Sequence, residues 1–369
     1  MPGPSRWGKC TASLLFPFFP PDFPSANPSL FPVLPRLLLL QLKRIGDAVL
    51  TAPAVGALRA AWPEAHIALV LAGAAGELAP LFAGADEVLT WQPGGLNLPL
   101  LRRLRRLRPD LALDFTSTDR SAFLALASGA PRRASYAKPN ASWLRRLAST
   151  ETCAAPVREL HTIDFHLALA ASLGLKPAPG PDAGHLHLPP DLALPPLPPG
   201  YALLHPGTAR AEKFWPVSHW RALLDHLHGR GLPLVLSGGQ DDFERRHIDA
   251  ILQGHPAPVV DLRGKLNLAQ LAGVVAAARL AVTVDTAAMH LAASFAVPQV
   301  GLFGPTNPFH WAPRHLRAEV LQAGVAPGTP PHPKRAGAPM ASLPWESAAA
   351  AADRCLADIR PPSPPPPED

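Results

Sequence analysis

Four loops in the chain carry polar side chains that could bind an anion or move a proton. The first loop is residues 44–47 (RIGD), directly after a run of leucines. A glycine there lets the backbone approach a ligand closely, and the carboxylate of Asp47 could accept a proton from a hydroxyl group. In the simpler interpretation, Asp47 only caps the helix that follows. The residues themselves leave both roles open.

The second loop is residues 205–216 (HPGTARAEKFWP). Thr208, Arg210 and Lys213 supply hydrogen-bond donors close together in the chain, and such donors bind phosphate oxygens. The alternative is a solvated loop that Trp215 anchors by packing. A phosphate site and an anchored loop are equally compatible with this spacing.

The third loop is residues 237–244 (SGGQDDFE), in which two glycines again permit close approach of a ligand. Asp241 and Glu244 have the spacing of a capping box. In such a box the first side chain caps the helix, and the second accepts a hydrogen bond from the backbone N–H of the capping residue. Glu244 could also bind a ribose hydroxyl. Asn267 and Gln270 form a similar box, to which we assign no chemistry.

The fourth loop is residues 284–290 (VDTAAMH), which open a helix after an apolar strand. Asp285 and Thr286 lie at the start of that helix, where exposed N–H groups and the helix dipole favour an anion. His290 lies about one turn further and could reach the same anion. The alternative is that Thr286 is only an N-cap and His290 a buried core histidine.

All four loops follow predicted strands and precede predicted helices. Strands are predicted at 37–42, 66–71, 87–91, 111–115, 132–136, 201–205, 234–237, 259–262, 280–284, 299–303 and 319–321. Helices are predicted at 48–61, 76–82, 98–107, 120–128, 161–173, 216–228, 242–252, 268–278, 287–296 and 346–359. Repeated strand–helix units indicate an α/β protein with parallel sheets covered by helices on both faces.

The composition indicates how these elements divide. Of 369 residues, 47% are hydrophobic, enough for large cores, and the 48 prolines are clustered rather than periodic. We predict a disordered leader, two domains joined by a Pro-rich linker, a Pro/Gly-rich segment, a last helix and a disordered tail. The leader is residues 1–35, the two domains are 36–175 and 201–323, and the linker between them is 176–200. The Pro/Gly-rich segment is 324–345, the last helix 346–360 and the tail 361–369.

The net charge of +6 indicates an anionic partner. A basic run at 102–108, with further arginines at 132, 133, 145 and 146, is either a solvated surface or a surface attracted to anionic lipid or an acidic glycan. No nucleic-acid-binding motif accompanies it. The three cysteines form no CxxC pair, which excludes a zinc ribbon, and no apolar stretch is long enough for a transmembrane helix.

Taken in order, the motifs resemble those of glycosyltransferase family 9, the ADP-heptose:lipopolysaccharide heptosyltransferases. The resemblance rests on RxGDxVLxxP, HPG…KxWP, SGG and DTxxMH…FGPTxP, at 44–53, 205–216, 237–239 and 285–308, and covers roughly residues 36–313. It implies a GT-B fold, in which two Rossmann-like domains with parallel sheets face each other across a cleft. The first domain would bind the acceptor and the second the nucleotide sugar. The last helix would cross back to the first domain.

The resemblance also implies a role for each motif residue. Asp47 matches the general base, Lys213 the residue that neutralises the departing diphosphate, and Glu244, or else Asp241, the ribose contact. The remaining matches are all to the donor phosphates: Thr208, Asp285, Thr286 with the N–H groups of Ala287 and Ala288, and His290. The family usually has glycine where this chain has Ala287, so a positive φ there would be strained.

The reaction that the resemblance implies is transfer of heptose from ADP-heptose to a hydroxyl of the lipopolysaccharide inner core, with inversion. Lys213 and the helix end would stabilise the leaving ADP without a metal or another cofactor. The expected protein is a cytoplasmic monomer with peripheral contact to the anionic inner-membrane surface and no nucleic-acid partner. The alternatives are a catalytically silent GT-B protein that binds nucleotide or glycan, and a GT-B enzyme that uses another nucleotide sugar.

Overall fold

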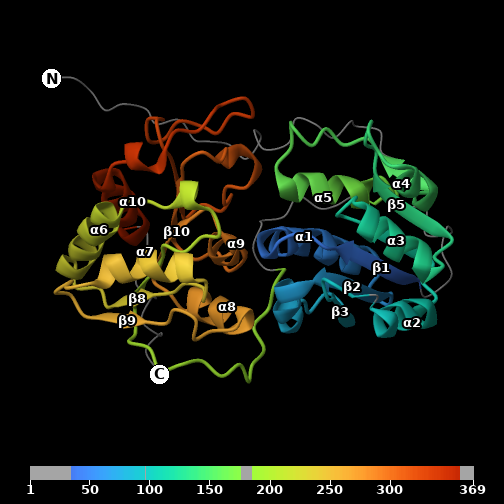
Figure 1. The fold of residues 1–369 in the computed structure, drawn as a ribbon, viewed down its shortest axis with the longest axis horizontal. Helices are drawn as coiled ribbons and strands as arrows, with labels where there is room; N and C mark the ends of the chain where they lie inside the picture. The colour runs from blue at the N-terminus through green and yellow to red at the C-terminus, as the bar shows by residue number, and fades with distance from the viewer. Residues whose placement is uncertain (1–34, 96, 176–184, 358–369) are drawn as a thin grey trace, which may run out of the picture.

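The computed structural model describes residues 35–95, 97–175 and 185–357, which form two parallel six-stranded sheets (Figure 1). The predicted leader apart from Pro35, residues 176–184 of the predicted linker and the tail at 361–369 lie outside the described residues. The expected α/β architecture with two parallel sheets is confirmed.

The first sheet has the strand order β3-β2-β1-β4-β5-β6, which is the order of a doubly wound Rossmann sheet. Its strands are β1 (Arg36–Gln41), β2 (His66–Ala72), β3 (Glu87–Trp91), β4 (Leu111–Asp114), β5 (Arg132–Tyr136) and β6 (Glu151–Cys153). Its helices are α1 (Ile45–Ala61), the 3₁₀ helix η3 (Gly73–Leu81), α2 (Leu98–Leu107), α3 (Asp119–Ser128), α4 (Trp143–Ala148) and α5 (Thr162–Ala171).

The second sheet repeats this order in its own strands, as β12-β11-β10-β7-β8-β9. The strands are β7 (Ala202–His205), β8 (Leu234–Leu236), β9 (Val259–Asp261), β10 (Leu280–Val284), β11 (Gln299–Phe303) and β12 (Ala318–Gln322). The helices are η4 (Ala211–Lys213), α6 (Val217–Gly229), α7 (Asp242–Leu252), α8 (Leu268–Ala276), α9 (Ala287–Ser294), η5 (Pro308–His310), η6 (Met340–Ser342) and α10 (Trp345–Ala357).

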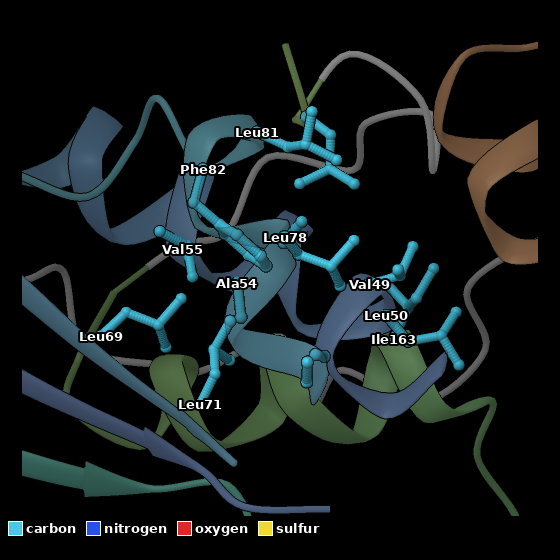
Figure 2. Close-up of a cluster of buried hydrophobic side chains, with 14 of the residues drawn as sticks. Val49, Leu50, Ala54, Val55, Leu69, Leu71, Leu78, Leu81, Phe82 and Ile163 are labelled. Atoms are coloured by element: carbon cyan, nitrogen blue, oxygen red, sulfur yellow. The ribbon is translucent and has the colours of Figure 1, made fainter. Parts of the chain in front are cut away.

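The leucine run of β1 shows why the sequence forms a central strand. Leu37 and Leu39 belong to one buried cluster, whereas Leu38 and Leu40 belong to another on the opposite face of the sheet. A strand that is buried on both faces needs a continuous apolar run rather than an alternating one. Figure 2 shows part of the first cluster, in which side chains of α1 meet those of β2 and η3.

Three expectations about elements need correction. The short elements α4 and β6 were not predicted, since six and three residues are too few to establish a period. The predicted helix at 76–82 is the longer 3₁₀ helix η3. The last helix does not cross back to the first domain: α10 contacts α6 and strands of the second sheet, and its buried alanines belong to the core of that domain.

The two domains are in direct contact. Helix α1 packs against α9, and η3 packs against α8 (Figure 1). Arg314 Nη1 lies 2.7 Å from Asp164 Oδ2, and His161 Nε2 lies 3.1 Å from the carbonyl oxygen of Ala312. Because both α1 and α9 begin at motif loops, this contact brings loops of the two domains to a common boundary.

Candidate functional site

The strand order determines where the motif loops meet. In each doubly wound sheet, the order reverses between two neighbouring strands, and ligands bind beyond the carboxyl ends of the strands at that point. These strands are β1 and β4 in the first sheet and β7 and β10 in the second. Three of the four motif loops follow β1, β7 and β10, and the SGG loop follows the adjacent β8.

Lys213 and Asp285 form a buried charged contact between two motif loops of the second domain. Lys213 Nζ lies 2.6 Å from Asp285 Oδ2 and also donates to the carbonyl oxygen of Asp285 at 3.2 Å. Their side chains are only 13% and 8% exposed. The loop after β7 thus places the Lys213 ammonium group at the start of α9, where the backbone N–H groups of the first helical turn also point outward.

Thr286 occupies the N-cap position of α9, but its hydroxyl donates to the carbonyl oxygen of Val284 at 3.3 Å. Within the described part of the chain, no side chain caps this helix. The first-turn N–H groups of Ala287 and Ala288 are therefore not used by the Thr286 hydroxyl. Ala287 has a negative φ, so replacing the usual glycine with alanine introduces no backbone strain.

Glu244 makes a contact that the sequence did not predict. Its carboxylate is buried against two loop glycines: an added Cβ would collide with it at Gly207 and would lie 2.6 Å from Oε2 at Gly239. Burial raises the pKa of Glu244, and a hydrogen bond from the Gly239 N–H acts in the opposite direction. These glycines make room for Glu244, which links the loops after β7 and β8.

The capping box predicted at 241–244 is wrong in its second half. Asp241 accepts a hydrogen bond from the N–H of Phe243 at 2.8 Å, whereas Glu244 is directed toward Gly239 instead of back to the cap. The corresponding box of Asn267 and Gln270 is complete, with bonds of 2.8 and 3.1 Å. Thr208 is buried nearby, and its hydroxyl accepts from the N–H of Arg210.

Asp47 lies in the first turn of α1, and its side chain is 24% exposed. The helix begins after Arg44, so Asp47 is not its N-cap residue. Lys43 Nζ lies 3.8 Å from Asp47 Oδ1. Both side chains line an open cavity of about 500 Å³ together with Arg44 and Arg120. The Asp47 carboxylate thus shares its cavity with three cationic side chains, which would attract an anionic ligand.

A buried polar network holds this loop from behind. The Thr51 hydroxyl donates to the carbonyl oxygen of Asp47, and the Gln41 amide donates to Thr51 Oγ1, each at 2.8 Å. The N–H of Leu42 donates to Thr116 Oγ1 at 2.7 Å. Sequence reasoning missed these residues, since buried Gln and Thr carry no motif and their contacts depend on the fold.

Asp114 supports the adjacent loop. It accepts hydrogen bonds from the N–H groups of Thr116 and Ser117 and from the Ser121 hydroxyl, at 2.8 to 2.9 Å. Burial raises the pKa of this carboxyl to about 6, although the three hydrogen bonds oppose the shift. Asp114 therefore connects the loop after β4 to the network around Asp47.

His290 brings the two domains together at the motif residues. Its ring is buried on α9 and lies against Gly46 of α1, where an added Cβ would be 2.8 Å from His290 Cδ2. The glycine of the RIGD motif is thus required by the approach of the other domain. His290 is therefore a buried histidine at the contact of α9 with α1, against the residue that precedes Asp47.

The structure gathers the predicted residues into two groups. Lys213, Asp285 and Thr286 lie together beyond β7 and β10, with Thr208 in the same loop as Lys213 and Glu244 in the first turn of α7. Asp47 faces its own cavity, and His290 packs against the neighbouring Gly46 across the boundary between domains. Among the residues that the structure describes, no group of three His, Cys, Asp or Glu side chains is placed to hold a metal ion.

Comparison with known proteins establishes the family. The model of glycosyltransferase family 9 (heptosyltransferase) matches residues 98–331, more than half of the chain. The chain belongs to glycosyltransferase family 9. Lipopolysaccharide heptosyltransferase 3 of Escherichia coli is 33% identical over 114 residues, which are 31% of this chain and 34% of that protein. Lipopolysaccharide heptosyltransferase 1 of Pseudomonas aeruginosa is 41% identical over 110 residues, 30% of each chain.

The aligned segments thus span about a third of the length of these curated family members. Solved structures match far more of the chain. A family 9 glycosyltransferase of Veillonella parvula has a TM-score of 0.76 at 21% identity, over 88% of this chain and 98% of that one. E. coli ADP-heptose lps heptosyltransferase II has a TM-score of 0.72 at 20% identity, over 87% and 98%. These likenesses confirm the predicted GT-B fold.

Proposed function

We propose that this chain transfers heptose from ADP-heptose to a hydroxyl of the lipopolysaccharide inner core, with inversion at the anomeric carbon. The observation that carries the proposal is the buried contact of Lys213 with Asp285 at the start of α9, with Asp47 across the domain boundary. A family relative supports the donor assignment, since E. coli heptosyltransferase WaaC has been solved with ADP and with ADP-2-deoxy-2-fluoro heptose.

In this proposal Asp47 acts as the general base. The acceptor oxygen attacks the anomeric carbon while its proton passes to the Asp47 carboxylate, and a positioned base of this kind contributes about 10²–10⁴-fold. Lys43 Nζ lies 3.8 Å from Asp47 Oδ1, so an ammonium group stands beside the proposed base. The bond from Thr51 to the carbonyl oxygen of Asp47 fixes the backbone that carries the base.

The leaving group in this proposal is ADP, which departs with the electron pair of the broken bond between the anomeric carbon and the phosphate oxygen. Lys213 and the N–H groups of Ala287 and Ala288 would stabilise the charge that develops on the diphosphate. Asp285 holds the lysine in place. Thr208, Thr286 and His290 are the further phosphate contacts, and no metal takes part.

For the ribose we propose Glu244 rather than Asp241, because Asp241 is exposed and already caps α7. The carboxylate of Glu244 lies between the loops after β7 and β8, beside the phosphate-binding residues. We further propose that the protein acts as a cytoplasmic monomer in contact with the anionic inner-membrane surface. No described helix is long and apolar enough to span a bilayer.

Calorimetric titration with ADP, ADP-heptose and UDP-sugars, without added metal, tests this function. We expect ADP-heptose to bind more tightly than ADP and UDP-sugars to bind weakly. Tighter binding of a UDP-sugar would indicate another donor. If no nucleotide binds, the chain is the catalytically silent GT-B protein considered above, and the proposed transfer is rejected.

A further inference from the structure

Helices α2, α3 and α4 form a surface at the end of the first domain that faces away from the second domain (Figure 1). Helix α3 contacts both α2 and α4, so the three helices make one continuous layer. We refer to it as the α2–α4 face. Its outer side carries side chains that are exposed to solvent.

This face holds a concentrated positive charge. Its three helices contain seven arginines and a single acidic residue, Asp119, so they carry +6, which equals the formal net charge of the whole chain. Arg103 pairs with Glu87, and Arg145 pairs with Asp119. The other five arginines are exposed: Arg102, Arg105, Arg106, Arg120 and Arg146.

Large apolar side chains lie among these charges. Trp143 and Leu147 of α4 are 69% and 60% exposed, and Phe123 of α3 is 44% exposed. The spacing of Trp143, Arg146 and Leu147 places all three on one side of α4, while Arg120 and Phe123 share one side of α3. Protein surfaces that insert into the interface of a bilayer typically combine exposed indole and aliphatic groups with neighbouring arginines, as this face does.

The face is also hollowed beside α4. Lys138, Arg145 and Arg146 line an open cavity of about 550 Å³. Burial, together with the neighbouring Lys43 and Arg145, lowers the pKa of Lys138, so positive charge in this region is only partly compensated. A phosphate head group is an anion whose charge would complement these three side chains.

We propose that the α2–α4 face docks on an anionic phospholipid bilayer, with Trp143, Leu147 and Phe123 inserted at the interface and the arginines against the head groups. Nucleic acid would satisfy the arginines but would leave the exposed Leu147 and Trp143 without an apolar environment. Arg120 lies on this face and also lines the cavity of Asp47. The docking surface makes the membrane contact of the proposed function specific and to that extent rests on it. Docking would hold the proposed base near acceptors that are anchored in the lipid.

Co-sedimentation of the full chain with vesicles tests the docking surface. We expect binding to phosphatidylethanolamine vesicles that contain about a third phosphatidylglycerol, and little binding to phosphatidylcholine vesicles. The double variant Trp143→Ser/Leu147→Ser and the variant Arg146→Glu should each bind the anionic vesicles about tenfold more weakly or worse. Their melting temperatures and ADP-heptose affinities should stay unchanged.

Two control variants carry matched changes on the second domain. Leu316→Ser removes a fully exposed leucine, and Arg246→Glu reverses an exposed arginine of α7. Both should bind vesicles like the wild type. The docking surface is rejected if the wild type does not bind anionic vesicles, or if the controls lose as much binding as the α4 variants.

Two further outcomes would replace the bilayer with another partner. The proposal fails if the α4 variants abolish binding to DNA at low salt while vesicle binding is absent, or if they convert a wild-type dimer to a monomer in light scattering. The donor titration is independent of these results. Vesicle binding without ADP-heptose binding would preserve the docking surface and reject the proposed transfer.

Discussion

The two halves of the candidate site are built in different ways. In the second domain, Lys213 and Asp285 are almost fully buried and in direct contact at the start of α9. In the first domain, Asp47 is partly exposed, its nearest cation is 3.8 Å away, and its cavity is open. A ligand of constant structure favours preorganised contacts, whereas an open surface tolerates a larger and more variable ligand. This difference agrees with the proposed nucleotide donor in the second domain and the proposed glycan acceptor in the first.

The largest effect is expected from Asp47→Asn. The amide keeps the shape of the side chain but cannot take a proton, so the turnover number should fall about 10²–10⁴-fold. ADP-heptose affinity should stay unchanged, because the donor contacts lie in the other domain. Measuring turnover and donor affinity on the same preparation distinguishes an effect on the proposed base from an effect on the donor contacts. Full turnover would show that Asp47 is not the base.

Lys213→Met should weaken donor binding about tenfold to hundredfold, because it removes a charge-assisted contact to the diphosphate and leaves Asp285 without its cation. Lys265→Met is the matched control, since this exposed lysine of the same domain should not affect donor affinity. Calorimetry with ADP measures the change. Equal affinities for the two variants would mean that the diphosphate binds elsewhere.

A third effect concerns stability of the first domain. Because the pKa of Asp114 is about 6 when folded and near 3.8 as a free side chain, the folded state holds this proton more tightly. Its contribution to the free energy of unfolding is fully present below about pH 4 and is lost as the pH rises through about 6. The loss should reach about 3 kcal/mol.

In Asp114→Asn, the side-chain oxygen can still accept from Thr116 and Ser117, and the pH-dependent loss should disappear. Urea unfolding of both proteins at several pH values between 4 and 7 gives the difference directly, and the groups that the two proteins share cancel. Parallel stability curves over this interval would contradict the expected titration of Asp114.

The smallest effect is expected from Ala287→Gly. Ala287 is helical with a negative φ, so glycine relieves no strain and only weakens α9, by up to about 1 kcal/mol. ADP affinity should change little. A large gain in affinity would mean that the alanine methyl group crowds the diphosphate, and that the second domain is less preorganised than its contacts indicate.

The sequence predicted those parts of the fold that depend on local pattern. The runs at β1, β10 and β11 are largely apolar, and all three form the strands that this pattern predicts. The elements α4 and β6 escaped prediction because they are short and their stability comes from neighbours. The pattern of motifs likewise indicated which strands carry functional loops, but not how those loops contact one another.

The contacts behind the motif residues could not be predicted in this way. Thr116 bonds to Leu42 over a separation of 74 residues, and Arg120 reaches the cavity of Asp47 from a different helix. Nothing in the local sequence distinguishes these polar side chains from solvated ones. The contact of Glu244 with Gly207 escaped prediction for the same reason, since it joins residues of two different loops.

The contact of Gly46 with His290 has a consequence for exchanging domains between relatives. The two residues lie in different domains, yet a Cβ at position 46 would overlap the imidazole ring. A chimera that takes its first domain from one parent and its second from another must therefore have compatible residues at positions 46 and 290. Otherwise α1 and α9 could not pack closely, and the two domains would lose their alignment.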